Sequence, residues 1–563
     1  MFSHNARTLG FTFSRSINHF NRFYSNKTLK LAVKTHSNKN SENNSGKKKD
    51  FGFSDTFKIV STVLLSTLLS ASVTTYYYED RFQNFKNFES NSVTKLNDLT
   101  TSQYGSKQDF DNAIAEIKQF IPEDNISQSP SEISTHSDNY WNSHHPTEDQ
   151  FPKIVIYPES TEDVSKLLKI SNKHNIPIVP YSGGTSLEGH FINTRNGIVI
   201  DLNRMNKIIK LNENDLDVVV QPGLGWQDLD EYLKPKNLLF GPDPGPGAEI
   251  GGMIGTSCSG TNAYRYGYNL TSLFIGSEGT LGIITEATLK LHNRPVNETV
   301  AVVSFDELND ATNTVQQILQ NNIQLNAIEL LDDEMMKCLN SSEATSKKWL
   351  EKPTILLKIV DPSIDDEKNL KNSKLISKVK NICQSNSSIN FEFAKNEDEK
   401  TELWSARKNI LWSSIDNGRR LLNNPNAAVC TTDVAVPITN LSEIIKEIKV
   451  KFELPKYKSR IYSTIVGHVG DGNFHTILIF DDTNKEDKLL IKELIDYMTQ
   501  RAIDLDGTCT GEHGVGFGKR TFLYNELGED AISLMRRIKL SLDPKRLLNP
   551  DKIFKIDPKD KDE

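Results

Sequence analysis

The stretch IYSTIVGHVGDGNFHTILIF, residues 461–480, predicts an antiparallel β-hairpin. Two runs rich in Ile, Thr, Val and Phe flank the pair Asp471-Gly472, and Asp-Gly between strands is a strong signal for a two-residue turn. In that register His468 lies directly opposite His475. Directly opposed side chains point to the same face of a sheet, roughly 5 Å apart at Cβ. We therefore expect two imidazoles side by side, either as metal ligands or as a polar pair at the surface.

A carboxylate that could complete a metal site follows in the glycine-framed segment 511–516, GEHGVG. Neighbouring side chains of an extended backbone point to opposite sides, so we expect Glu512 to face the metal and His513 to face a substrate. Two histidines and one carboxylate form a recurrent open site that leaves coordination positions for substrate oxygens. The hypothesis is a divalent metal, with zinc expected, bound by His468, His475 and Glu512.

Four glycine-rich segments lie far upstream of the hairpin. They are Tyr181–His190, Gly241–Gly247, Gly251–Asn262 and Gly276–Ala287. A single Gly-Gly loop is most often only a turn. Four of them together indicate loops that approach an extended, flat ligand closely, with backbone N–H groups that can hold a pyrophosphate.

The residues that precede the first of these segments alternate between strand and helix patterns. Ile154–Tyr157 and Ile176–Pro180 are short apolar runs that predict strands. Between them, Thr161 is expected to cap a helix whose residues Val164 and Leu167 share one apolar face.

In this order the four segments resemble the FAD-binding domain of the vanillyl-alcohol oxidase (PCMH) type, over roughly residues 148–293. The resemblance implies a set of residues around the FAD pyrophosphate: Ser182, Gly183, Gly184, Thr185, Ser186, Gly189 and His190. It also implies a set along the adenine and flavin channel: Pro242, Asp243, Pro244, Ser259, Gly260, Asn262 and Ile284. Members with covalent flavin carry a histidine where this chain has Thr185, so non-covalent FAD is implied.

One departure from this family concerns the join at Gly267 and Tyr268. Relatives carry a stretch of a few dozen residues there, which includes strands of the second FAD subdomain, whereas this chain runs straight through. Lost strands leave open sheet edges or exposed core. The hypothesis is that the chain, as written, holds FAD poorly.

The histidine hairpin, the Gly-Glu-His-Gly motif and residues 403–408 (LWSARK) resemble the D-lactate and D-2-hydroxyglutarate dehydrogenase branch of this family. The resemblance implies the same metal ligands, His513 as the catalytic base and Arg407 as the residue that binds the substrate carboxylate. Taken alone, Arg407 reads as a solvated charge on a helix. Asn549 resembles the point at which the C-terminus returns to the flavin.

The activity implied is oxidation of D-lactate to pyruvate, with electrons passed to cytochrome c. D-Lactate is preferred because the apolar Ile477 and Ile479 follow the second histidine, where a diacid would need polar contacts. D-2-Hydroxyglutarate is the alternative substrate, and a flavin oxidase that uses oxygen is an alternative enzyme. A different class of function is an inactive, membrane-anchored binding protein, which the lost FAD-domain segment would explain.

The predicted fold class is α+β: a two-subdomain FAD-binding domain and a cap with an antiparallel sheet that carries helices on one face. Strands are expected at Ala301–Ser304 and Ile355–Ile359, and a helix at Glu307–Asn321. The predicted domain boundaries are 1–55 (presequence and linker), 56–78 (membrane or sorting segment), 79–147 (linker with a helix near Asp109–Phe120), 148–293 (FAD domain), 294–540 (cap) and 541–563 (C-terminal return).

The N-terminus predicts mitochondrial targeting. Residues 1–41 hold no Asp or Glu and seven Lys or Arg, among Ser, Asn and aromatic residues, which is typical of a presequence; a disordered basic tail is the alternative. The 20 residues Ile59–Tyr78 carry no charge, a length that can cross a bilayer. Lys47–Lys49 on one side and Glu79-Asp80 on the other predict a catalytic domain in the intermembrane space, anchored to the inner membrane. The segment is equally compatible with a cleaved sorting signal.

The bulk composition excludes two other classes of protein. The chain has 563 residues and a net charge of −8, which argues against general nucleic-acid binding. Its five cysteines are scattered without a C-x-x-C pair, so neither a disulfide framework nor a thiolate metal site is indicated.

Overall fold

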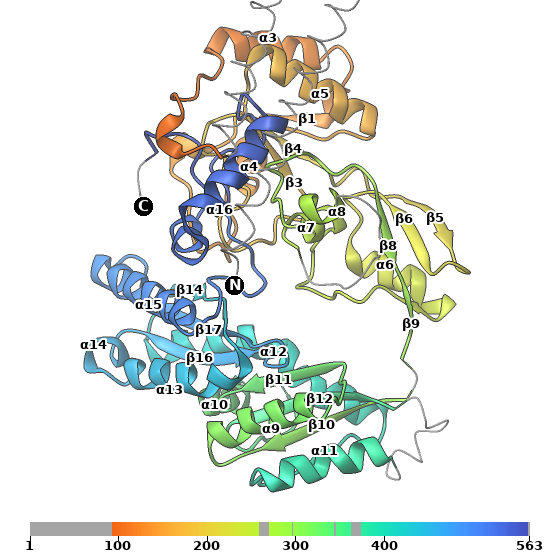
Figure 1. Cartoon of the computed structure of the whole chain (residues 1–563), viewed down its shortest axis with the longest axis vertical. Helices are drawn as coiled ribbons and strands as arrows, with labels where there is room; N and C mark the ends of the chain where they lie inside the picture. Colours follow the sequence, from red (N-terminus) through yellow and green to blue (C-terminus); the bar gives the residue numbers. More distant parts are fainter. Residues whose placement is uncertain (1–92, 258–269, 296, 343–344, 362–372, 561–563) are drawn as a thin grey trace, which may run out of the picture. The chain divides into compact units, whose positions relative to one another are not determined.

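The computed structural model describes residues 93–257, 270–295, 297–342, 345–361 and 373–560. Within these residues, an N-terminal region holds small sheets and a C-terminal region, here called the cap, holds one large antiparallel sheet (Figure 1). The expected presequence and membrane segment, residues 1–55 and 56–78, lie outside the described residues. In the part of the chain that is described, no helix is both long enough and apolar enough to span a bilayer.

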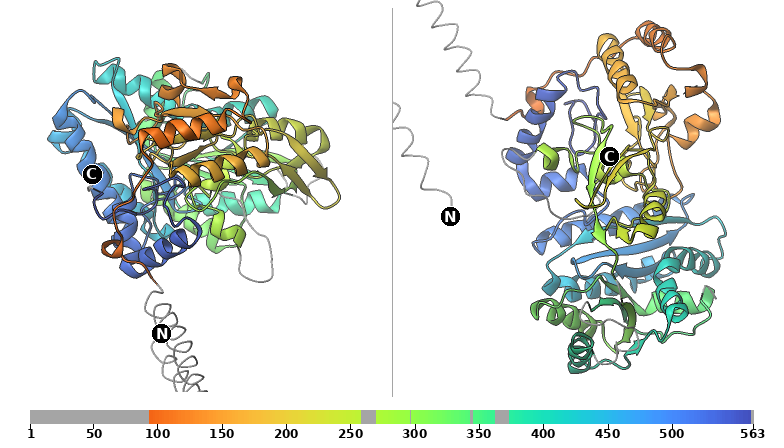
Figure 2. Two further views of the ribbon diagram at one scale, coloured as in Figure 1. Left: turned by 90° about the horizontal axis from the view of Figure 1, so that it is seen from above. Right: turned by 90° about the vertical axis from the view of Figure 1, so that its right-hand side faces the viewer.

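The first sheet of the N-terminal region has the strand order β1-β2-β4-β3, in which β2 and β3 run parallel to β4. The strands are β1 (Ile126–Ser127), β2 (Ile154–Ile156), β3 (Ile178–Tyr181) and β4 (Ile198–Asp201). Helices α3 (Lys107–Ile117) and α5 (Thr161–His174) lie side by side on this sheet (Figure 1, Figure 2). The helix expected near Asp109–Phe120 is thus α3, and its apolar face belongs to this core.

The residue that caps the N-terminus of helix α5 differs by one position from the prediction. Ser160, not Thr161, is the N-cap residue, since its hydroxyl accepts a hydrogen bond from the backbone N–H of Asp163. Thr161 is the first residue of the helix itself. The two adjacent hydroxyl residues are equivalent to a propensity argument, and only the backbone geometry separates them.

A second, smaller sheet joins β5 (Ile208–Asn212), β6 (Asp217–Val220) and β8 (Ala287–Lys290), all antiparallel. It has its own apolar core with helices α6 (Trp226–Leu233) and α7 (Ile250–Gly255). The remaining elements of this region are α4 (Pro130–Thr135), α8 (Leu270–Phe274), β7 (Leu238–Leu239), β9 (His292–Asn293) and the 3-10 turns Leu96–Asp98, Glu123–Asn125, Glu148–Gln150 and Lys234–Lys236. The predicted residues Ser259, Gly260 and Asn262, and the join at Gly267 and Tyr268, lie outside the described residues.

The cap sheet has the strand order β13-β10-β12-β11-β16-β17-β14, and a short β15 also pairs with β17. Its strands are β10 (Glu298–Ser304), β11 (Ala327–Leu331), β12 (Thr354–Val360), β13 (Glu392–Phe393), β14 (Ala428–Thr431), β15 (Val434–Ala435), β16 (Tyr462–Gly467) and β17 (Asn473–Phe480). All of the strand pairs are antiparallel. The strands expected at Ala301–Ser304 and Ile355–Ile359 are confirmed as β10 and β12, and the expected helix Glu307–Asn321 is α9.

Helices cover both faces of the cap sheet, so the expectation of helices on one face was wrong. One face packs against α9 (Leu308–Gln320), α11 (Lys374–Ser385), α13 (Leu441–Phe452) and α15 (Lys485–Asp504); the other packs against α10 (Asp333–Ser342) and α12 (Glu397–Leu421). A short α14 (Pro455–Lys458) and a 3-10 turn (Ile438–Asn440) flank α13. The physical reason lies in the strands, which carry apolar residues at successive positions: Leu478 is buried on the first face and Ile479 on the second.

The hairpin at the centre of the cap has a different register from the one predicted. His475 pairs with Val466 rather than with His468, and the connection between β16 and β17 is longer than two residues. A turn forms instead between His468 and Asp471, whose N–H donates to the carbonyl of His468. The shift is by two residues, and an even shift keeps each side chain on its original face. The two histidines therefore still share one face, as diagonal rather than direct neighbours.

The last helix, α16 (Arg520–Leu542), leads the chain from the cap to the N-terminal region. It bends at Gly528, whose φ is 78°. Lys539 donates to the carbonyl of Thr280, and Leu548 forms a parallel bridge with Ile178 at the edge strand β3. The C-terminal residues thus extend the first sheet.

A pair of truncations tests the two-sided burial of the cap sheet. Leu478→Ala and Ile479→Ala should each lower the free energy of unfolding by about 2–5 kcal/mol, because each removes a fully buried side chain from a different face. Leu489→Ala, at a residue that is 68% exposed on α15, is the matched control and should change it by less than about 0.5 kcal/mol. Denaturant titration provides the measurement, and a near-neutral Ile479→Ala would contradict a covered second face.

Candidate functional site

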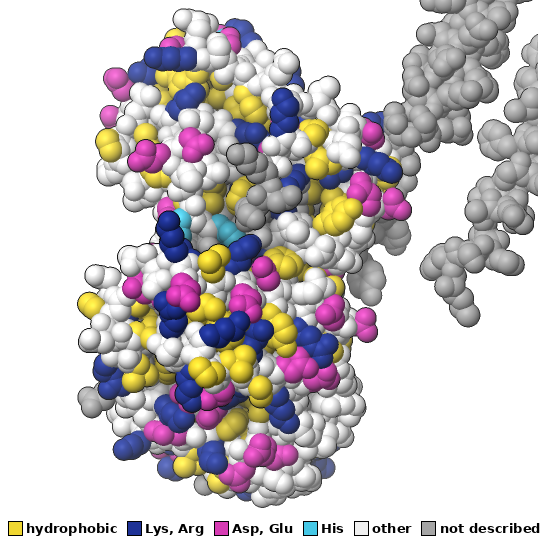
Figure 3. All heavy atoms as spheres, turned by 90° about the vertical axis from the view of Figure 1, so that its left-hand side faces the viewer, with side chains coloured by type: hydrophobic (Ala, Val, Ile, Leu, Met, Phe, Trp, Pro, Cys, Tyr) yellow, Lys and Arg dark blue, Asp and Glu magenta, His cyan; other side chains and the backbone are white. Residues whose placement is uncertain are grey.

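Three predicted metal ligands meet on the α12 face of the cap sheet. Nε2 of His468 lies 3.3 Å from Oε1 of Glu512, and Nε2 of His475 lies 3.0 Å from the same oxygen. The three ligand atoms are all within 4.8 Å of one another. His475 is buried in β17, whereas His468 and Glu512 are about one-third exposed. Figure 3 shows histidine side chains in the hollow between the upper and lower parts of the molecule, beside lysine and arginine side chains.

The orientation of both imidazoles is set by their Nδ1 atoms. Nδ1 of His475 donates to the carbonyl of Thr432 at 3.0 Å, and Nδ1 of His468 donates to Oε1 of Glu329 at 2.6 Å. A hydrogen bond from Nδ1 directs the Nε2 lone pair of a neutral imidazole into the site. Two nitrogen lone pairs and a carboxylate then converge, an arrangement that a shared cation satisfies. The donor set therefore fits a divalent metal.

The electrostatics of this group follow from its composition. Burial favours neutral forms, but the carboxylates of Glu329 and Glu512 outweigh it and raise the pKa of His468 to about 10. Without a metal this imidazole is therefore protonated near pH 7, and a cation that binds Nε2 would displace that proton. Burial also opposes ionisation of Glu512, yet the two histidines hold the pKa of this carboxyl well below its usual range. The two histidines thus help to keep the carboxylate of Glu512 ionised.

Glu329 is a functional residue that the sequence reading missed. It lies in β11, is 5% exposed, and accepts a hydrogen bond from Nε of Arg407 at 2.7 Å as well as the one from His468. Nη2 of Arg407 lies 3.3 Å from Nε2 of His468. A single acid inside the apolar strand sequence AIELL was the available signal, because a buried carboxylate needs charged partners.

Arg407 owes its position to helix α12. Asn396 caps this helix by accepting from the N–H of Glu399, and the acidic first turn suits the positive end of the helix dipole. Leu403 and Ala406 bury one side of α12 against the sheet, which leaves Arg407 at the margin of the buried face. The residue expected to bind the substrate carboxylate therefore projects beside the histidines.

His513 also lies in this cluster. Its ring stacks on that of His475, with centroids 5.0 Å apart and an interplanar angle of 14°. Burial, together with the nearby His475 and Lys519, lowers its pKa to about 4, against the opposing charge of Asp433. The imidazole is therefore neutral near pH 7 and able to accept a proton.

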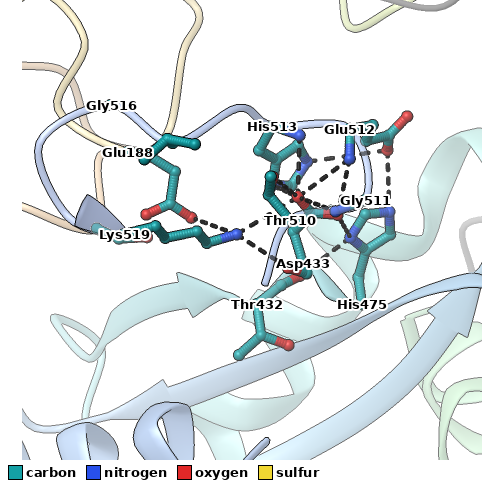
Figure 4. Close-up of polar contacts among 12 residues, drawn as sticks. Glu188, Thr432, Asp433, His475, Thr510, Gly511, Glu512, His513, Gly516 and Lys519 are labelled. Atoms are coloured by element: carbon teal, nitrogen blue, oxygen red, sulfur yellow. Dashed lines mark hydrogen bonds and ion pairs between the residues drawn. The ribbon is translucent and has the colours of Figure 1, made fainter. Parts of the chain in front are cut away.

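The prediction that the side chains of Glu512 and His513 point to opposite sides was wrong. Nε2 of His513 lies 3.8 Å from Oε1 of Glu512, so both side chains face the same space. The backbone here is not extended. The successive N–H groups of Gly511, Glu512 and His513 all donate to the carboxylate of Asp433 (Figure 4). Alternating strand geometry cannot direct three consecutive N–H groups to one acceptor.

The glycine-rich segments of the N-terminal region line a second candidate site, a pocket that is open to solvent. Six of the predicted FAD-binding residues line it: Ser182, Gly184, Ser186, His190, Ile284 and Asn549. Gly183, Thr185 and Gly189 belong to the same loop without lining the cavity. Asp243 is instead near the cap, close to the charges of Lys358, His468 and Arg407. The flanking Pro242 and Pro244 are half-buried.

Two observations test whether the residues of this cavity fit FAD. Nδ1 of His190 and Oδ1 of Asn549 are buried, with no hydrogen-bond partner among the described residues. The glycines are also needed as glycines: a Cβ on Gly252 would lie 2.5 Å from the carbonyl oxygen of Ser182, and Gly183 has a φ of 75°. Unpaired polar groups and a close backbone cradle fit a polar, extended cofactor.

Comparison with known proteins shows the family to which the chain belongs. Residues 152–273 match the family model for the FAD binding domain, and residues 294–553 match the model for the C-terminal domain of FAD linked oxidases. The mitochondrial D-lactate dehydrogenase [cytochrome] of Kluyveromyces lactis is 47% identical over 536 residues, which cover 89% of this chain and 91% of the relative. D-Lactate dehydrogenase [cytochrome] 1 of Saccharomyces cerevisiae is 47% identical over 507 residues, 83% of this chain and 84% of its own.

A solved structure of alkyldihydroxyacetonephosphate synthase superimposes with a TM-score of 0.61 at 20% identity, over 81% of this chain and 87% of the other, which supports the fold alone. The alignment with the Kluyveromyces relative carries further information. Because 89% of the 563 residues is about 501, about 35 of the 536 aligned positions hold a residue only in the relative. By its sequence and its fold, the chain belongs to the FAD-linked oxidase family, in the group of the mitochondrial cytochrome-type D-lactate dehydrogenases.

Proposed function

We propose that this protein oxidises D-lactate to pyruvate with a non-covalently bound FAD and passes the electrons to cytochrome c. The observation that carries the proposal is the convergence of Arg407, two histidines and Glu512 on one face of the cap sheet, beside the neutral His513. The relatives that are 47% identical are D-lactate dehydrogenases of the cytochrome type, which supports the choice of substrate and acceptor.

The guanidinium of Arg407 binds the substrate carboxylate. Its Nε is engaged by Glu329, so the plane of the group is fixed while its terminal N–H groups remain directed toward the histidines. A planar guanidinium forms paired hydrogen bonds with a carboxylate, which gives orientation as well as affinity. Glu329 thereby positions both Arg407, which binds the substrate, and His468, which binds the metal.

Nε2 of His513 accepts the proton of the substrate hydroxyl. This nitrogen is 3.8 Å from Oε1 of Glu512 and so faces the same space as the metal ligands. The buried carboxylate of Asp433, 3.9 Å from Nδ1 of His513, favours the imidazolium that forms. His468, His475 and Glu512 would hold a divalent metal, for which zinc suits the ligands, and it would lower the pKa of the hydroxyl group. FAD, when bound along the Ser182–Ser186 loop, supplies the acceptor for the hydride.

The distinction between D-lactate and D-2-hydroxyglutarate does not rest on Ile477 and Ile479. Both side chains are buried in the core beneath α12, together with Leu403 and Ile415, and neither faces the substrate space. The expectation that they select a small substrate was therefore wrong. D-Lactate is preferred on the strength of the close relatives.

For the location, we propose the mitochondrial inner membrane, with the catalytic part in the intermembrane space. The basic, acid-free residues 1–41 and the uncharged stretch Ile59–Tyr78 support this placement. The names of the two yeast relatives also support a mitochondrial protein. Cytochrome c is a reachable acceptor in that compartment.

Direct assay tests the proposed reaction. The purified chain, supplied with FAD, should reduce cytochrome c when D-lactate is added, and faster than with D-2-hydroxyglutarate or L-lactate at equal concentration. Oxygen uptake measured in parallel separates a dehydrogenase from an oxidase. A higher kcat/KM for D-2-hydroxyglutarate would reassign the substrate, and oxygen uptake that accounts for all turnover would reassign the acceptor.

Replacement of the base gives a second test. His513→Ala should lower kcat by about 10²- to 10⁴-fold, because proton transfer to a positioned group contributes about that factor, while the bound metal is retained. Turnover and metal content measured on the same sample give both readouts. His145→Ala, at an imidazole that is 60% exposed and paired with Asp138, is the control and should retain turnover. Near-normal kcat in His513→Ala would remove this residue from the role of base.

Flavin occupancy is a third test, because about 35 aligned positions have no residue in this chain and the predicted deletion near Gly267 affects the FAD domain. The chain should purify with well under one FAD per protein, and added FAD should raise turnover. Visible absorption of the purified protein measures the occupancy, with the Kluyveromyces lactis relative prepared in parallel as the control. Full occupancy of this chain would refute the weak-binding hypothesis.

A further inference from the structure

The loop that carries Glu512 and His513 is folded around one buried carboxylate, Asp433. This side chain has no solvent exposure and follows strand β14, well separated in sequence from the loop. Oδ2 of Asp433 accepts from the hydroxyl of Thr510 at 2.7 Å and from the N–H groups of Gly511 and His513, each at 2.9 Å. The N–H of Glu512 is 3.1 Å from both carboxylate oxygens. Figure 4 shows these contacts converging on Asp433.

A fifth donor supplies the balancing charge. Nζ of the buried Lys519 lies 3.4 Å from Oδ2 of Asp433, donates to its backbone carbonyl at 2.9 Å, and lies 3.2 Å from Oε1 of Glu188. Burial raises the pKa of Asp433, but Lys519 and the neighbouring imidazoles outweigh it, so the carboxyl stays ionised. Glu188 belongs to the flavin-binding loop. The charge chain Asp433–Lys519–Glu188 therefore joins the cap to the FAD domain (Figure 4).

The carboxylate of Asp433 also lies within 4.8 Å of the ligand atoms of His475 and His513. Its two oxygens are used differently. All five donors reach Oδ2, whereas among the described residues Oδ1 accepts only the shared N–H of Glu512, so Oδ2 is committed to the loop and to Lys519. The carboxylate acts on the site through the backbone of residues 510–513.

We propose that Asp433 is the positioning residue of the site: it folds residues 510–513 into a nest of N–H groups around its carboxylate and so brings Glu512 and His513 to the two histidines of the hairpin. This inference rests on the proposed function for the roles of Glu512 and His513. An amide cannot replace the carboxylate, because its NH₂ group would face the converging N–H donors. Arg407, on helix α12, is held independently by Glu329.

The test compares three variants of the full chain. Asp433→Asn should weaken the affinity for Zn²⁺ by about 10- to 100-fold, the usual effect of removing a partner that orients a metal ligand. Thr510→Val, which removes one donor and keeps the side-chain shape, should weaken it in the same direction by a smaller factor. Asp332→Asn is the matched control, since Asp332 is a buried carboxylate of the cap whose partners are Lys449 and the N–H of Met335. It should leave the Zn²⁺ affinity at the wild-type value.

Competition of each protein with a chromophoric chelator measures the Kd for Zn²⁺, and steady-state assays with added FAD measure kcat and KM for D-lactate. In Asp433→Asn, kcat should fall while KM stays within about twofold, because Arg407 is untouched. Wild-type affinity for Zn²⁺ in Asp433→Asn, or an equal loss in Asp332→Asn, would overturn the proposal. If Asp433→Asn does not fold, Thr510→Val decides by the same criterion. A wild-type chain that binds Zn²⁺ without oxidising D-lactate would refute the proposed function, and the Zn²⁺ comparison would still decide the role of Asp433.

Discussion

Charge neutralisation of one buried carboxylate, that of Glu329, is the constraint on which the site depends. A carboxylate in an apolar strand is tolerated only with charged or hydrogen-bonding partners. Glu329 finds them in Arg407 and His468, which come from a helix and a hairpin far apart in the sequence. The same two contacts that satisfy its charge fix the guanidinium that we propose binds the substrate and orient an imidazole that we propose binds the metal. The contacts that stabilise the buried carboxylate of Glu329 are therefore the same contacts that set the geometry of the site.

The cap sheet gives this constraint its setting. Because helices cover both of its faces, a polar cluster on either face must be partnered within the protein, and the recess beside α12 is where polar residues break the apolar pattern. His475 lies in β17 among fully buried neighbours such as Phe474 and Thr476. Its ring is held by the hydrogen bond from Nδ1 to the carbonyl of Thr432 and by stacking on His513. The more exposed side chains of His468 and Glu512 are positioned by a hydrogen bond to Glu329 and by ion pairs with each other and with His475, rather than by packing.

Sequence patterns alone predicted the elements of this site better than their arrangement. The two histidines were expected on one face, and they are, although the turn was misplaced, because a shift of two residues preserves the face of a strand. The relation of Glu512 to His513 was wrong because an extended backbone was assumed where three N–H groups turn to Asp433. Glu329 and Asp433 were missed since their partners lie some 80 or more positions away along the chain. The glycine-rich loops were sufficient to predict the cavity, but the side-chain partners of Asp243 came only with the tertiary structure.

The bridge between Leu548 and strand β3 has a consequence for the order in which the molecule is made. The N–H of Ile178 donates to the carbonyl of Leu547, and the N–H of Asn549 donates to the carbonyl of Ile178, each at 2.8 Å. One edge of the first sheet thus pairs only with residues that are synthesised after the whole cap sheet. Until they arrive, the nascent N-terminal region keeps an unpaired strand edge and an unfinished cofactor pocket. A chain that stops before Leu547 lacks Asn549 and therefore one wall of the pocket, although the other walls are synthesised much earlier. Cofactor binding thus depends on translation past this point.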